Sequence, residues 1–201
     1  MKQPYGVATR SDQWLVVAVS VAVVVGTLVA AVRRLVQLVP NHDVPVELAV
    51  DAPRQPVTLD GVGDPVMAEF DRVLVRVPEL PWVSWIAAVV GVVATALAIV
   101  VVMTCLALLC RHLAAGRYFT ASNTRLLSAA ALAMAGGWLV DLVTTTLVGN
   151  GALSRLTESD EVLTVTASID GEYLFAAIVL GCLAAAFHAG ERMQRDAEGL
   201  V

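Results

Sequence analysis

Charged and aromatic side chains are scarce in this sequence. Only 15% of its 201 residues are charged and 5% are aromatic, whereas 58% are apolar. In soluble domains about a quarter of all residues are charged. Together with a mean hydropathy of +0.76, this shortage of charge excludes an ordinary soluble protein. The length fits a single domain.

Cysteine is also rare, and the common catalytic motifs are missing. The three cysteines, Cys105, Cys110 and Cys182, lie within or at the ends of apolar stretches, where an odd number argues against a disulfide framework. There is no C-x-x-C, H-E-x-x-H or G-x-S-x-G pattern, and no basic stripe for nucleic acid. We therefore expect no enzyme activity, no bound metal, no cofactor and no nucleic-acid partner.

Four long apolar stretches are present instead. The longest, residues 82–110, contains no charged residue, and about 20 apolar residues in a helix suffice to cross the hydrocarbon core of ~30 Å. We predict a single-domain, all-α integral membrane protein with the lipid bilayer as its solvent. The predicted transmembrane helices lie near 14–36, 83–110, 122–148 and 173–190.

The first stretch has a competing interpretation as a cleaved signal peptide. Its apolar part is longer than usual, and Arg33 and Arg34 stand where a small-residue cleavage site should end. We favour an uncleaved helix.

Basic residues predict the orientation. They are dense in 1–13, 111–125 and 189–201, whereas 13 of the 18 acids fall in the outer loops 37–82 and 149–172. Because basic residues concentrate in cytoplasmic segments, we expect a multi-pass protein of the plasma membrane with both termini cytoplasmic. Arg33 and Arg34 argue the other way, but can snorkel to the headgroups.

The outer loops contain segments with the alternation of β-strands. VPVELAV at 44–50, QPVTLDG at 55–61, DRVLVRV at 71–77 and EVLTVTASID at 161–170 alternate apolar and polar residues. Single hairpins are marginal alone, so we predict a small extracytoplasmic β cap formed by the two outer loops. Extended loops without a sheet are the alternative.

Asp141 is the one acid inside a predicted span. An intramembrane carboxylate is costly and marks a paired site or an ion pathway. Asp141 lies about two turns from the predicted outer end of the third helix. Its candidate partners are Thr145, Arg33 and Arg34. The small residue Gly137 precedes it by four positions. A polar tether between helices and a proton or cation relay both remain open.

Small residues at a spacing of four predict helix-packing faces. Gly137 belongs to one such row in the third helix, and Gly181 and Ala185 belong to another in the fourth.

The inner loop reads RHLAAGRYFTASNTRLL at 111–127. Gly116 can end the second helix in a left-handed conformation, Phe119 suits the membrane interface, and Thr120 or Ser122 can cap the third helix near Asn123. The spacing G-x-x-F-T-x-x-N from Gly116 to Asn123, the tail AAAFHAGERMQRDAEGLV and the four spans resemble the bacterial membrane family catalogued as domain of unknown function 2975. The resemblance covers roughly residues 10–201, although these helices are richer in Ala and Val than is usual in the family.

The resemblance implies no assigned activity, but a frequent gene neighbour that encodes a small helix-turn-helix regulator. We therefore expect a non-enzymatic accessory or signalling protein that acts through contacts with a protein partner or a second copy. The alternative is a small ion- or proton-coupled transporter that uses Asp141.

Overall fold

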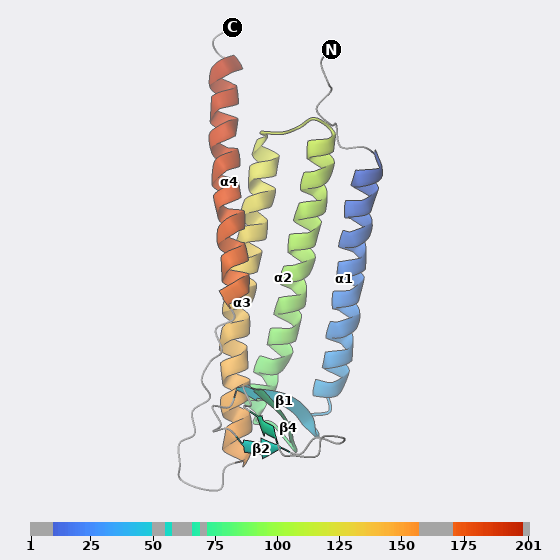
Figure 1. Cartoon of the computed structure of the whole chain (residues 1–201), viewed down its shortest axis with the longest axis vertical. Coiled ribbons are helices and arrows are strands. Elements are labelled where there is room, and N and C mark those ends of the chain that lie inside the picture. The colour runs from blue at the N-terminus through green and yellow to red at the C-terminus, as the bar shows by residue number, and fades with distance from the viewer. Residues whose placement is uncertain (1–9, 50–54, 58–65, 69–71, 157–170, 199–201) are drawn as a thin grey trace. The chain divides into compact units, whose positions relative to one another are not determined.

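A computed structural model describes residues 10–49, 55–57, 66–68, 72–156 and 171–198. Four long helices follow one another in the order shown in Figure 1: α1 (Arg10–Leu38), α2 (Trp82–Ala114), α3 (Ala121–Leu156) and α4 (Gly171–Glu198). Each is long and apolar enough to cross a membrane. Four-span architecture, the central prediction from the apolar stretches, is confirmed.

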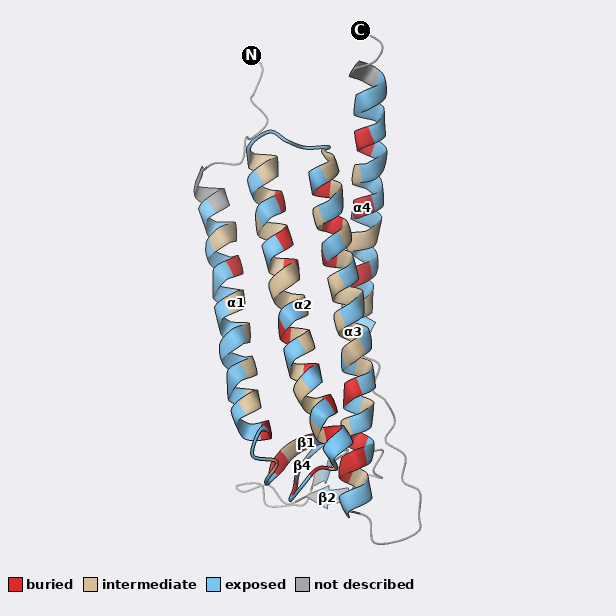
Figure 2. Ribbon diagram, turned by 180° about the vertical axis from the view of Figure 1, so that it is seen from behind, coloured by how far each residue is buried: buried red, intermediate tan, exposed pale blue. Residues whose placement is uncertain are grey.

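The surfaces of these helices are apolar. Only 6% of the most apolar 18-residue stretch of α1 is buried. Trp14, near the start of this helix, is 73% exposed. Figure 2 shows exposed residues along most of α1. Apolar surface of this extent is unfavourable in water and favourable in lipid, and a helix satisfies its own backbone groups there. The protein is therefore a multi-pass membrane protein.

The third helix extends beyond its predicted end. It continues to Leu156, so residues 149–156 are helical and do not belong to the outer loop 149–172. Gly151 lies in this extension, where a Cβ would collide with the Ser84 side chain, so glycine allows α3 to lie close against α2.

The chain divides into two compact units. We call residues 34–91 and 141–169 the cap unit, and residues 1–33, 92–140 and 170–201 the helical unit.

The cap unit contains four short strands. β1 (Val44–Ala49) pairs antiparallel with β4 (Arg72–Val77), and β2 (Gln55–Val57) pairs with β3 (Val66–Ala68), as two separate two-stranded sheets. Val44, Val46 and Leu48 are buried while Glu47 is exposed, which is the period of two that predicted this strand. The predicted strands within 44–77 are confirmed, β3 was not expected, and segment 161–170 lies outside the described residues.

Hydrogen bonds join the helix ends and turns that flank β1 and β4 in the cap unit. The Asn41 side chain both donates to the Leu80 carbonyl and accepts from the Leu80 amide, at 3.1 Å each. Trp85 Nε1 donates to the Leu38 carbonyl at 2.8 Å. Leu38, Val44, Val77 and Leu80 are almost fully buried beside them. The cap unit thus has a core of its own.

Helices α2 and α3 pack in one register in both units. In the cap unit Ser84 lies against Gly151, and Gly91 against Thr144. In the helical unit Ala98 lies against Gly137, while Cys105 and Ala130 share one buried cluster.

The α2 positions of these pairs are seven residues apart, and so are the α3 positions in reverse order. A repeat of seven is the period of antiparallel helices that cross at a shallow angle. Small residues at these positions let the two backbones approach closely.

Candidate functional site

The short connection between α2 and α3 has a defined end at Gly116. Gly116 has a φ of 77°, its amide donates to the Leu113 carbonyl at 3.0 Å, and the Arg117 amide donates to the His112 carbonyl at 3.0 Å. This pair of bonds is a Schellman motif, in which glycine takes the left-handed position. The chain therefore turns out of α2 at the residue that the sequence predicted.

Thr120 begins the next helix. It directly precedes α3, and its Oγ1 accepts from the Asn123 amide at 3.4 Å, as an N-cap residue does for the third helical position. Of the two predicted capping residues, Thr120 takes the role, and Ser122 is exposed. Only three residues, 117–119, thus separate the two caps.

The side chain of Asn123 holds this connection together. It is fully buried, at 0% exposure, and its Nδ2 donates to the carbonyls of Arg117 and Tyr118, at 2.7 Å each. Its Oδ1 lies 2.8 Å from Nδ1 of His112 on α2. Since both amide hydrogens are used, Oδ1 must accept, and Nδ1 of His112 must carry the proton. Asn123 therefore continues the α2–α3 register, seven residues beyond the Ala130 position.

The fourth helix packs against the same loop. The rings of Phe119 and Phe187 lie 5.4 Å apart between centroids, and a Cβ on Gly190 would collide with the Phe119 ring. Glu191, only 8% exposed, accepts from the Thr124 hydroxyl at 3.5 Å and pairs with Arg195. We call the cluster of His112, Phe119, Asn123, Gly190 and Glu191 the loop cluster.

Sequence reasoning found Phe119 and Asn123 of the loop cluster, together with the helix caps Gly116 and Thr120 beside it. Gly116, Phe119, Thr120 and Asn123 came from one spacing, and the structure brings them together. His112, Gly190 and Glu191 were missed as members. Their signal was weak: a polar residue at the end of an apolar stretch looks like ordinary interfacial chemistry until its partner is known.

The surface around the loop cluster is basic and aromatic. Arg117 and Arg125 are exposed, as is Arg192 on α4, and Tyr118 is 57% exposed. Among the described side chains of this region, the acids are Glu191, which pairs with Arg195, and Asp196. The exposed residues are thus suited to an acidic surface.

Asp141 lies deeper in its helix than predicted. Because α3 ends at Leu156, Asp141 is about four turns from that end, at 3.6 residues per turn, where the sequence predicted two. The Thr144 hydroxyl donates to its backbone carbonyl at 3.2 Å, and the Thr145 hydroxyl donates to the same atom. Arg34 donates to the Pro45 carbonyl at 2.9 Å, and Arg33 is exposed. Pairing of the Asp141 carboxylate with an arginine or threonine stays a prediction.

The buried residues of α4 recur along one face of the helix. Ala177, Ala184 and Glu191 are buried, whereas Ala185 is exposed and a Cβ on Gly181 would meet no described atom within 4 Å. The buried positions are seven residues apart, as in α2 and α3. A spacing of seven keeps side chains on the face toward a neighbour that crosses at a shallow angle, and packing through Gly181 and Ala185 stays a prediction. Gly137 does pack, with Ala98.

Comparison with known protein families identifies a family that covers most of the chain. The profile of the family described as "Protein of unknown function (DUF2975)" matches residues 72–198. This range contains all of α2, α3 and α4 and every residue of the loop cluster. No curated protein and no solved structure matches the chain.

Proposed function

Because the chain belongs to the DUF2975 family, whose function is unknown, we propose that it is a non-enzymatic accessory or signalling protein of the membrane. It acts by docking a protein partner on the exposed surface around the loop cluster. The single observation that carries the proposal is the buried side chain of Asn123, which holds a three-residue loop in one conformation.

A loop held in this way presents its exposed side chains at low entropic cost. Association loses affinity when side chains and loops must be ordered on binding, and preorganisation removes that loss. Tyr118 is exposed directly beside the backbone carbonyls that Asn123 holds. Tyrosine and arginine are the residue types that contribute most to binding at interfaces. Arg117 and Tyr118 are therefore the proposed centre of the docking surface.

Charge supports an acidic partner. Arg117, Arg125 and Arg192 are exposed here, and complementary charge steers association and suppresses wrong partners. We propose an acidic face of a helix-turn-helix regulator as the partner, with its basic DNA-binding face left free. This partner requires the loop to face the cytoplasm of a bacterial cell, as the basic residues favour.

Site-directed photocrosslinking in native membranes tests the proposal. A benzophenone amino acid replaces Tyr118, and a matched control replaces Leu74 in β4, which is 60% exposed. We expect a helix-turn-helix protein among the products at position 118 and none at position 74. Arg117→Glu should reduce the product at position 118 several-fold. Crosslinks at position 74 alone, or products at position 118 that contain only a second copy of the chain, would contradict the proposal.

Transport through Asp141 is the second candidate, favoured by its place far from either end of α3. In reconstituted vesicles the docking function expects no proton flux above that of empty vesicles. A flux that Asp141→Asn abolishes without loss of thermal stability would replace the docking function by transport. If Asp141 is a tether, Asp141→Asn should fold normally and Asp141→Leu should be less stable in detergent.

A further inference from the structure

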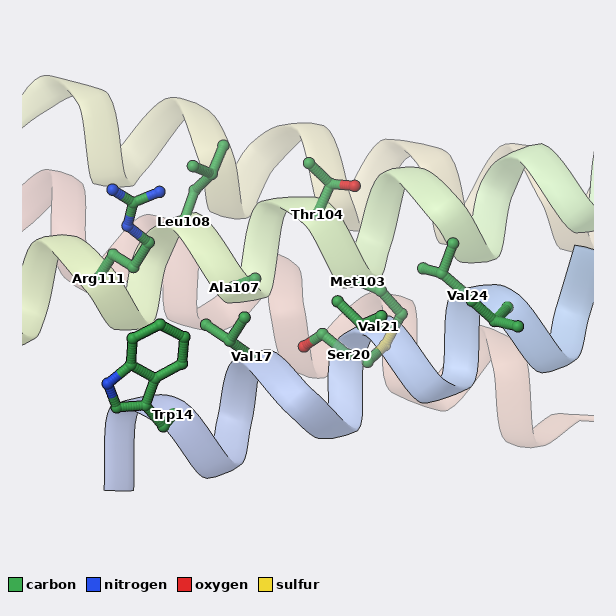
Figure 3. Close-up of a pocket in the computed structure, with 11 residues that line it drawn as sticks. Trp14, Val17, Ser20, Val21, Val24, Met103, Thr104, Ala107, Leu108 and Arg111 are labelled. Atoms are coloured by element: carbon green, nitrogen blue, oxygen red, sulfur yellow. The ribbon is translucent and has the colours of Figure 1, made fainter. Parts of the chain in front are cut away.

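A groove of about 770 Å³ runs between α1 and α2 within the helical unit. Figure 3 shows its lining, with Trp14 and Arg111 at one end and Val24 toward the other. Valines of α1 form one wall, and Met103, Ala107 and Leu108 of α2 form the other. The volume is that of a small-molecule site.

Neither hydroxyl in the walls of the groove has a proton left to donate to a ligand. The Ser20 hydroxyl donates to the Val16 carbonyl at 2.8 Å, and the Thr104 hydroxyl donates to the Val100 carbonyl at 2.7 Å. Both bonds run within their own helices. A ligand with polar groups along its length would leave them unpaired here, so the body of the occupant must be apolar.

The end of the groove is different, because Arg111 lines it. The Arg111 side chain makes no hydrogen bond or ion pair with another described residue. A guanidinium at the end of an apolar wall is matched to a phosphate, which it can bind through two parallel N–H donors. Trp14 stands at the same end, where indole rings suit the headgroup level of a bilayer.

The length of the groove selects between a lipid and a helix as occupant. Its α1 wall runs from Trp14 to Val25, about 16 Å at a rise of ~1.5 Å per residue. This is about half of the ~30 Å hydrocarbon core, the depth of a single leaflet. A transmembrane helix of a partner would need a groove twice as long.

We infer that this groove binds an anionic glycerophospholipid of the leaflet on the side of the α2–α3 loop. Its phosphate lies on Arg111, and one acyl chain lies along Val17, Val21 and Ala107. Basic pockets between transmembrane helices bind lipid headgroups by the same chemistry. The site shares no residue with the docking surface centred on Arg117 and Tyr118.

Native mass spectrometry of the full chain tests the inference. The protein is exchanged into detergent with equal amounts of phosphatidylglycerol and phosphatidylcholine, and retained lipids are counted. We expect about a tenfold preference for phosphatidylglycerol, because the choline cation of phosphatidylcholine repels Arg111 and offsets the phosphate charge, whereas the glycerol headgroup leaves the net negative charge intact. Arg111→Gln should abolish the preference. Arg125→Gln, which removes an exposed arginine outside the groove, should keep it.

A second pair of variants tests the apolar wall without touching the charge. Ala107→Phe fills the groove and should reduce retention of both lipids, whereas Leu97→Phe, at an exposed position of α2 outside the lining, should not. Equal retention of the two lipids by the unaltered chain would overturn the inference. So would a change in the number of subunits, but not in bound lipid, caused by Ala107→Phe, because a second copy would then be the occupant.

Discussion

At the scale of single residues, Asn123 does the most for the site. Its amide pairs with two consecutive backbone carbonyls of the loop and with the ring of His112. No other common side chain of this size offers two donors and an acceptor in one plane. The loop has no regular structure to satisfy its carbonyls, so a side chain must supply the donors.

We expect Asn123→Ala to lower the free energy of unfolding by about 3 kcal/mol, because each buried group left without a partner costs ~1–3 kcal/mol. The carbonyls of Arg117 and Tyr118 both lose their donor. Asn123→Asp should be about as harmful, since a carboxylate cannot donate to carbonyls.

Thermal unfolding in detergent measures the effect, with the exposed Ser122→Ala as the matched control. A melting temperature for Asn123→Ala equal to that of the control would show that the loop holds its shape by other means. The crosslink at position 118 should weaken together with stability, because the docking surface depends on the same bonds.

At the scale of elements, the antiparallel pair of α2 and α3 explains the placement of the small residues. Gly91, Gly137 and Gly151 each face a side chain of α2 or α3 so closely that a Cβ would collide with it. Membrane helices gain little from apolar burial against each other, so close backbone approach and van der Waals contact must replace it. The register that results also places His112 opposite Asn123.

Two adjacent glycines provide a matched test of this packing. A Cβ on Gly137 would lie 2.7 Å from the Cβ of Ala98, whereas one on Gly136 would meet no described atom within 4 Å. We expect Gly137→Ala to be less stable than Gly136→Ala by about 1–3 kcal/mol, the usual cost of overpacking. Both substitutions gain the same helix propensity, so it cancels.

Thermal unfolding of the two variants in one detergent decides the point. A Gly136→Ala variant less stable than Gly137→Ala would mean that the face of α3 toward α2 has been assigned to the wrong row of residues.

At the scale of the whole molecule, the chain consists of the cap unit, which has a buried core of its own, and the helical unit. In the cap unit Asn41 bonds to Leu80, Trp85 of α2 bonds to Leu38 at the end of α1, and Arg34 of α1 bonds to Pro45 of β1. The helical unit contains both proposed surfaces, the loop cluster and the lipid groove. Both sites thus belong to the unit that carries the α2–α3 loop.

Four spans predict that both termini lie on one side of the membrane. Reporter fusions after Val201 should be active in the cytoplasm, and fusions within 55–65 should be active on the opposite side, because basic residues concentrate in cytoplasmic segments. Activity of both fusions on one side would contradict the topology and, with it, docking of a cytoplasmic regulator.

Physical signals that lie within a single segment of the chain could be read from the sequence. Long apolar stretches determined four membrane helices, and alternation of apolar and polar residues determined the strands of 44–49 and 72–77. The ends of α2 and α3 at Gly116 and Thr120 were readable because caps use one or two residues. These signals are local, since each acts on its own segment.

Tertiary structure decided what depends on a partner far along the chain. The period of seven on α2, α3 and α4 follows from the angle at which helices cross, and it places Ala177, Ala184 and Glu191 of α4 in buried positions. The bond between His112 and Asn123 and the groove that ends at Arg111 exist only where two helices meet. A long apolar stretch shows that a helix lies in lipid or protein. Which helix becomes its neighbour depends on side-chain shape and hydrogen bonding across the interface.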